Sequence, residues 1–244
     1  MEVHHHPEVP HGIKKHFKEY FLEFVMIFLA VTMGFISENI REHFSDRSKE
    51  HEYIVGLVKN LQDDTTQLKL VINQNQLQMN GIDSIWKINK TKLTDVKVQD
   101  SLFLLTSKYI FYANNFKNNQ VTLSLLKNAG GYGLIRSNTV LDSIAAYESR
   151  IRDMDDEFNY NVASLIKARD YANLLFDFSL GHQFWTHRTS TPVLINSDKE
   201  KIYQYYNQCW LVTLGLGGYN QMLKNHYKYS THFIEFLKKE YDVE

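Results

Sequence analysis

Hydrophobic residues follow two different patterns along this chain of 244 residues. From Phe24 to Phe35 every side chain except Thr32 is apolar or glycine, so this run has no polar face. Beyond residue 53 the apolar positions recur at alternating steps of four and three, which is the pattern of an amphipathic helix with one buried stripe. The first pattern predicts a helix surrounded by lipid, and the second predicts a helix packed in a bundle.

The apolar run predicts a transmembrane helix over residues 20–37. A helix of about 17 residues covers roughly 25 Å, and flanking aromatic and basic side chains extend it toward the edges of a ~30 Å hydrocarbon core. A buried helix of a soluble domain usually keeps one polar face, and this run has none. Glu23 lies near the headgroup level, where its carboxylate costs less than at the bilayer centre. The residues that we expect to define the span are Glu23, Phe24, Ile27, Phe28, Val31 and Phe35.

The flanks of the run predict how it is inserted. No small-residue cleavage site of the A-x-A type follows it, so we expect an uncleaved signal anchor rather than a cleaved signal peptide. Three lysines lie close to its start, whereas acids dilute the basic residues after it, which favours an N-terminus on the inside. We therefore expect a single-pass protein of the inner (cytoplasmic) membrane, with a polar His-rich cytoplasmic leader at 1–19 and a periplasmic domain at 38–244.

A long amphipathic helix is predicted after the span. Because residues 38–53 contain no proline or glycine, we expect the span to continue into this helix with little or no break. Its stripe has the spacing of a coiled-coil seam, and two polar residues interrupt it. A polar residue in a seam can fix register, but we favour local exposure of the helix there. The predicted stripe is Ile54, Val58, Leu61, Thr65, Leu68, Ile72, Asn75, Met79, Ile82 and Trp86.

Three further helices and a corner are predicted between residue 101 and about residue 180. The segment 101–116 is predicted as a short aromatic-rich helix. Another helix reaches Lys127 and is stopped by Gly130 and Gly131, which supply a left-handed cap. The next helix begins after Ser137 or Asn138 and is predicted to continue to about residue 180.

The last long helix is predicted over 199–239. Its stripe is Ile202, Tyr205, Cys209, Val212, Leu216, Tyr219, Leu223, Phe233 and Leu237, and the "GLGGY" segment within it predicts either a close helix contact or a kink. The chain is therefore predicted to be all-α: an N-terminal transmembrane helix that continues into an antiparallel bundle of about four main helices.

A block of residues near the middle of the chain matches a pattern found elsewhere. An acid near the start of the apolar span is followed by a leucine-lysine pair, a glycine, a leucine-isoleucine pair and then spaced apolar residues and a tyrosine: Glu23, Leu126, Lys127, Gly130, Leu134, Ile135, Leu141, Ile144 and Tyr147. In these residues the chain resembles uncharacterised single-pass membrane proteins of Bacteroidota that carry a domain of unknown function. The resemblance implies a membrane-anchored helical domain and assigns no chemistry.

Composition narrows the range of activities. The net charge of -1 gives no overall electrostatic attraction to a nucleic acid, so we expect no nucleic-acid partner. The single cysteine, Cys209, excludes an intramolecular disulfide and a thiolate metal cage. The sequence contains no motif typical of hydrolases, metalloproteases or nucleotide-binding proteins. We therefore expect no catalytic residues, no metal site and no cofactor.

One irregular segment remains as a candidate ligand-binding site. It contains His182, Trp185, His187 and Arg188, with Asp177 near them in sequence. An arginine with two histidines is suited to an anion, and loops on rigid scaffolds often bind ligands. The alternative, which we favour, is a long connection that covers the end of the bundle.

These patterns favour a structural or protein-interaction module of the cell envelope. Its expected partners are the lipid bilayer and either a second copy of the chain or another envelope protein. The alternative is an extracytoplasmic ligand-sensing bundle that works with a partner subunit.

Overall fold

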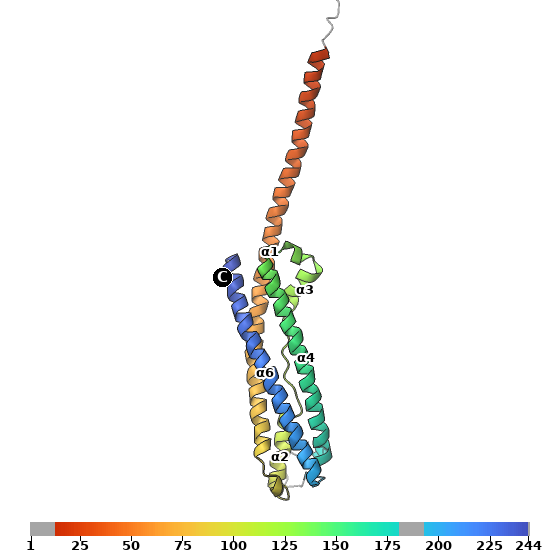
Figure 1. The fold of residues 1–244 in the computed structure, drawn as a ribbon, viewed down its shortest axis with the longest axis vertical. Helices are drawn as coiled ribbons and strands as arrows, with labels where there is room; N and C mark the ends of the chain where they lie inside the picture. Colours follow the sequence, from red (N-terminus) through yellow and green to blue (C-terminus); the bar gives the residue numbers. More distant parts are fainter. Residues whose placement is uncertain (1–12, 181–192, 244) are drawn as a thin grey trace, which may run out of the picture. The chain divides into compact units, whose positions relative to one another are not determined.

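A computed structural model describes residues 13–180 and 193–243 and arranges them in an all-α fold, as predicted (Figure 1). The long helices are α1 (Ile13–Lys87), α4 (Asn138–Leu175) and α6 (Lys199–Tyr241), and the short ones are α2 (Val96–Tyr109) and α3 (Val121–Asn128). Single 3-10 turns lie at η1 (Lys90–Lys92), η2 (Gly131–Leu134) and η3 (Phe178–Leu180). Residues 1–12 of the predicted leader lie outside the described range.

The chain divides into two compact units, residues 1–52 and 53–244. In the first unit α1 carries a run of exposed apolar side chains, from Phe17 at 73% exposure to Ile36 at 52%. Its most apolar window has a mean hydropathy of 2.0 and is not buried at all, so the helix is long and apolar enough to cross a membrane. The absence of a break in α1 up to Lys87 is also as predicted.

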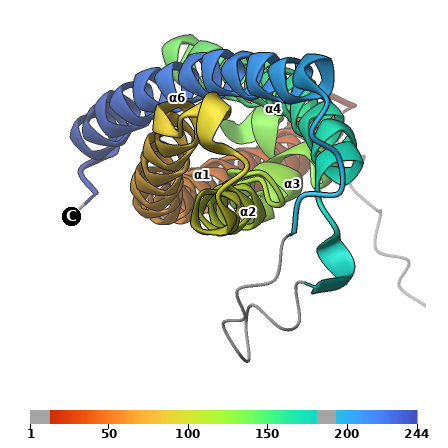
Figure 2. The same cartoon turned by 90° about the horizontal axis from the view of Figure 1, so that it is seen from below.

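The second unit is a bundle in which four segments alternate in direction. α1 and α4 run one way and α6 runs the other way, so that Lys69 of α1 lies over the ring of Tyr227 and Trp86 lies beside Tyr206. The fourth position holds α2, an extended connector at 110–120 and α3 in succession. In the end-on view α2 and α6 lie on opposite sides, with α1 and α4 between them (Figure 2). The predicted four-helix bundle is thus three long helices and one composite segment.

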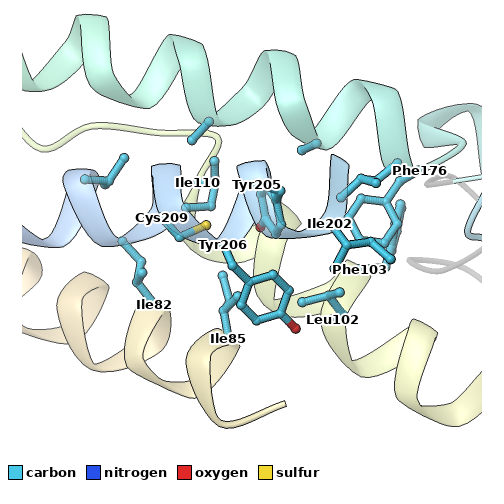
Figure 3. Close-up of a cluster of buried hydrophobic side chains, with 14 of the residues drawn as sticks. Ile82, Ile85, Leu102, Phe103, Ile110, Phe176, Ile202, Tyr205, Tyr206 and Cys209 are labelled. Atoms are coloured by element: carbon cyan, nitrogen blue, oxygen red, sulfur yellow. The ribbon is translucent and has the colours of Figure 1, made fainter. Parts of the chain in front are cut away.

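Three apolar clusters form the core of the bundle. The stripe predicted for α6 is confirmed, because each of its members is at most 6% exposed. At one end Ile82 and Ile85 of α1 face Tyr206 and Cys209 of α6, and aromatic residues of α2 and of the segment after α4 complete the cluster (Figure 3). There the rings of Phe103 and Phe176 are 5.7 Å apart between centroids.

The buried seam of α1 differs from the predicted stripe. Every second predicted position, such as Leu61 and Leu68, lies on it. Of the intervening positions Val58 is also buried, at 3% exposure, whereas the other four lie one residue later than the buried positions and are partly exposed: Thr65, Ile72, Met79 and Trp86. The seam follows steps of three and four, and each member is at most 4% exposed: Ile54, Leu57, Leu61, Asp64, Leu68, Val71, Asn75, Gln78, Ile82 and Ile85. Because the predicted stripe was chosen mainly from apolar residues, it does not include Asp64 and Gln78. We expected the helix to be locally exposed at its two polar stripe positions. Thr65 is partly exposed, but the expectation is wrong for Asn75, which is completely buried.

Two helices, α2 and α4, also differ from prediction in their boundaries. α2 begins at Val96 with Asp95 as its cap, and it ends at Tyr109 instead of residue 116. α4 ends at Leu175 instead of residue 180, because Phe176 pairs with Leu194 in an isolated β-bridge. Backbone bonds from Asp177 N to Val193 O and from Ile195 N to Leu175 O, both 2.9 Å, complete this pairing.

The predicted glycine roles are confirmed in part. Gly130 is left-handed with φ of 68°, whereas Gly131 lies in η2 with an ordinary φ. Ser137 is the N-cap residue of α4, although its side chain makes no capping bond. α6 passes unbroken through its glycines, and a Cβ on Gly215 would lie 2.1 Å from Asn161 Oδ1 of α4. The glycine segment therefore permits a close helix contact.

Candidate functional site

The predicted ligand-binding residues His182, Trp185, His187 and Arg188 lie outside the described residues. Asp177, which is described, has a local role: its Oδ1 accepts hydrogen bonds from the backbone N–H and the hydroxyl of Ser179. The polar groups that the structure does bring together lie elsewhere, around the connector at 110–120.

The connector is an extended chain without helix or strand partners, so its backbone polar groups need other hydrogen-bond partners. Side chains from the three long helices supply them. Gln78 of α1 donates to the carbonyl oxygens of Tyr109 and Tyr112 at 2.8 and 3.0 Å. Arg169 of α4 donates to the carbonyl oxygen of Ile110 at 2.9 Å. The hydroxyl of Tyr219 of α6 accepts from the backbone N–H of Phe116 at 3.1 Å.

Side-chain amides add a second set of contacts. Asn114 Nδ2 lies 3.3 Å from Asn75 Oδ1 and 3.2 Å from Gln78 Oε1, and it donates to both. The Tyr219 hydroxyl donates to Asn115 Oδ1 at 2.9 Å. Burial raises the pKa of Tyr219 to about 12, so its hydroxyl stays neutral and keeps its proton for this bond. The polar residues of the α1 seam thus bind the connector, which explains their burial.

α3 receives only part of its N-terminal cap locally, from Asn119 Oδ1, which accepts from the backbone N–H of Val121 at 3.2 Å. The rest comes from another helix. Its own N-cap residue, Gln120, makes no side-chain capping bond. Instead Asn60 Oδ1 accepts from the backbone N–H of Thr122 at 3.0 Å, and Asp64 Oδ1 accepts from the backbone N–H of Asn119 at 2.7 Å. Because Asn60 and Asp64 are one helical turn apart on α1, they fix both the position and the direction of α3.

Asp64 is the most perturbed acid of this region. Burial raises its pKa to about 6, and the hydrogen bonds from Tyr147 and Asn119 oppose that rise. It borders a polar hollow of about 540 Å³ that Asp63 and three asparagines of the connector also line. An acid with a pKa near 6 beside a hollow is a candidate general base. However, its side chain is only 2% exposed, and Tyr147 and Asn119 occupy both oxygens, so the contacts describe a structural acceptor.

His226 of α6 packs directly against this group. Its ring centroid is 4.8 Å from that of Tyr147, and the side chain is 1% exposed. Neither ring nitrogen has a hydrogen-bond partner. Burial and the nearby Arg150 charge lower its pKa to about 4, so the ring is neutral at physiological pH. An unpartnered neutral imidazole in this position acts as a packing group.

Cys209 was predicted to pack in the apolar stripe, and the structure confirms this. It is completely buried in the cluster of Figure 3. Burial raises the pKa of its thiol to about 12, so the nucleophilic thiolate does not form near neutral pH.

Two features of the sequence point to the connector contacts, although the prediction did not use them. If the steps of three and four are continued from Ile54 without regard to polarity, they reach Asp64, Asn75 and Gln78. The asparagine-rich segment "ANNFKNNQ" at 113–120 lacks a helical apolar pattern, and it supplies the groups that those residues bind. Neither feature alone indicates which helix holds the segment.

No family model matches this chain, and no curated protein or solved structure matches it. The likeness to Bacteroidota membrane proteins therefore stays a prediction from the sequence. The fold and the contacts described above are the basis for the functional proposal.

Proposed function

We propose that this chain is a membrane-anchored helical bundle that acts as a structural or protein-interaction module of the cell envelope, without catalytic activity. The observation that carries the proposal is the apolar run of α1. Between residues 17 and 36 its large apolar side chains, apart from Val25, are more than half exposed. Leaving so much apolar surface in water is unfavourable by about 25 cal/mol per Å², and a bilayer removes that cost.

The proposed placement has the span at 20–37 in the inner membrane, the leader inside and the bundle outside. The distribution of lysines and acids around the span supports this orientation. The bundle also exposes large apolar residues of α6, which favours a protein partner over a purely solvated spacer. These are Tyr203, Trp210, Leu211 and Leu214, each 50 to 53% exposed.

Cysteine labelling tests the anchoring and the orientation together. Cys209 is completely buried and the pKa of its thiol is raised, so it should not react with a membrane-impermeant maleimide. A cysteine at the exposed position Leu77 should be labelled in intact spheroplasts, and one at Lys18 only after permeabilisation. The reverse pattern contradicts the orientation, and recovery of the labelled chain in the soluble fraction contradicts the anchor.

The interaction role needs a separate test. A photo-crosslinking residue at Trp210 or Leu214 should give a discrete covalent adduct in the membrane fraction, with either a second copy or another envelope protein. The matched control is the same residue at Lys224, an exposed polar position of α6. If neither apolar position gives an adduct above the control, the interaction role is wrong.

A further inference from the structure

A hollow lies at the end of the bundle where η1 follows the last residue of α1 and where α6 begins. Its volume is about 350 Å³, within the range of small-molecule sites. Its floor is apolar, because Leu93 and Ile202 are only 5 and 6% exposed, and Tyr203 forms part of its wall. This hollow shares no lining residue with the connector contacts described above.

The polar lining of this hollow is entirely basic or neutral. It consists of two lysines, Lys90 and Lys199, and the hydroxyl residues Thr91, Thr94 and Ser197. Lysine ammonium groups and hydroxyls are the groups that donate hydrogen bonds to an anion. Among the lining residues that the structure describes, none carries a carboxylate that would neutralise the lysines.

The acids nearest in sequence to these lysines accept hydrogen bonds from groups two to four residues further along the chain. Asp198 accepts from the backbone N–H of Glu200 at 2.9 Å, and Glu200 accepts from Gln204 at 3.2 Å. Asp95 accepts from the backbone N–H of Lys97 at 2.9 Å. Within the described residues neither lysine of the hollow forms an ion pair, so their charge is left for an outside partner.

Lys90 is held in place by aromatic rings. Its Nζ lies 4.5 Å from the ring centroid of Tyr206, 5.0 Å from that of Trp86 and 5.2 Å from that of Tyr203. Such contacts restrict a flexible ammonium group without neutralising its charge. A cation that is already oriented loses less entropy when it binds an anion than a free surface lysine does.

We propose that this hollow binds a small organic anion with an apolar body, with its charged group at Lys90 and Lys199 and its apolar part on Leu93 and Ile202. The combination of an apolar floor with lysines and hydroxyls at the rim fits such a molecule better than a bare inorganic ion or a neutral apolar compound. The site goes beyond the proposed function and does not depend on it, because binding is measurable whether or not the chain is anchored.

Isothermal titration of the full chain in detergent micelles tests this site, with phenyl phosphate as the probe. Phenyl phosphate should bind saturably, and benzyl alcohol, which lacks the charge, should bind at least ten-fold more weakly. Inorganic phosphate, which lacks the apolar body, should also bind at least ten-fold more weakly. If either control compound binds as well as phenyl phosphate, or if phenyl phosphate does not saturate, the proposal is wrong.

Lysine variants locate the binding. Lys90→Gln and Lys199→Gln should each weaken phenyl phosphate binding at least five-fold. Lys108→Gln is the matched control, because Lys108 also lies over a tyrosine ring, at 5.2 Å from the Tyr109 centroid, but does not line the hollow. Lys199 has no described ring contact, so Lys199→Gln decides the question even if Lys90→Gln lowers the stability of the fold. Equal affinity in Lys199→Gln and the native chain would overturn the proposal.

Discussion

Two stretches of the same helix place their apolar residues in opposite surroundings. Between Phe17 and Ile36 the large apolar side chains of α1 lie on all sides, and all but Val25 are exposed. From Ile54 to Ile85 most of them follow one seam and are buried, although Val55, Leu70 and Leu77 are exposed. The first stretch has no face that favours water, and the second has both an inner and an outer face. The two stretches therefore differ both in mean hydropathy, which reaches 2.0 in the first, and in the angular distribution of their apolar residues.

The largest expected effect comes from charge in the first stretch. The double variant Ile27→Asp, Val31→Asp adds about 5 to 7 kcal/mol to the cost of insertion, at about 2.5 to 3.5 kcal/mol for each residue near the centre of a span. We expect the chain to move from the carbonate-resistant membrane fraction to the soluble fraction. The matched control is Leu70→Asp, Leu77→Asp, at positions of the second stretch that are 52 and 65% exposed, and it should remain in the membrane.

The next effect comes from making the seam of the second stretch more apolar. Gln78→Leu completes the heptad pattern but removes the donor for the carbonyl oxygens of Tyr109 and Tyr112. We expect a loss of about 2 to 4 kcal/mol in the free energy of unfolding, since unpaired buried polar groups cost about 1 to 3 kcal/mol each. Denaturant unfolding in micelles, followed by circular dichroism, measures this loss.

Thr65→Leu is the control for that variant. Thr65 is partly exposed, and its hydroxyl bonds only to the carbonyl oxygen of Gln62 in its own helix. Its replacement should change stability by less than about 0.5 kcal/mol. If Gln78→Leu instead stabilises the protein, the connector does not depend on the hydrogen bonds that Gln78 donates.

Gly81 tests how closely the second stretch is packed. A Cβ at this position would lie 2.3 Å from the ring of Tyr109 in α2, so Gly81→Ala should destabilise the bundle by about 1 to 3 kcal/mol. A Cβ at Gly217 of α6 meets nothing within 4 Å, so Gly217→Ala should stabilise the bundle by up to about 1 kcal/mol. Stabilisation by both variants would mean that the α1–α2 contact is looser than described.

The smallest net effect concerns acid dependence around Asp64. Its raised pKa of about 6 means that the folded chain holds an extra proton between pH 6 and 4, so this residue adds stability as the pH falls. His226, with a pKa lowered to about 4, does the opposite: the unfolded chain gains a proton below about pH 6.5 and the folded chain does not. Each shift corresponds to at most about 3 kcal/mol, and the two largely cancel.

Single variants should reveal these opposed effects. Relative to the native chain, His226→Phe should gain stability as the pH is lowered from 6.5 to 4, whereas Asp64→Asn should lose stability over the window from 6 to 4. Thermal unfolding across this pH range measures both. Parallel pH profiles for the two variants would contradict the assigned pKa shifts.

Part of the fold was predictable because it depends on local pattern. The whole stripe of α6 follows from its spacing, and the turn at Gly130 follows from its freedom to adopt a positive φ. The continuation of α1 beyond the span follows from the lack of proline and glycine at residues 38–53. The connector was not predictable in the same way. Its stability depends on Gln78, Arg169 and Tyr219, which come from three different helices.

The hollow at the end of the bundle illustrates the same limit. Lys90 and Lys199 are 109 positions apart in the numbering, and nothing in either local sequence indicates that they line one cavity. The predicted site at His182, Trp185, His187 and Arg188 rested on composition alone and lies outside the described residues.

By itself the sequence determined the helical class, the apolar run that suits a membrane and most of the helix positions, because these depend on residues close together along the chain. Only the tertiary structure decided that the fourth bundle position contains an extended segment and that polar residues of the α1 seam are buried. The physical reason is that burying a polar group costs free energy unless a partner satisfies it. For Asp64, Asn75 and Gln78 that partner lies about thirty to eighty positions further along the chain.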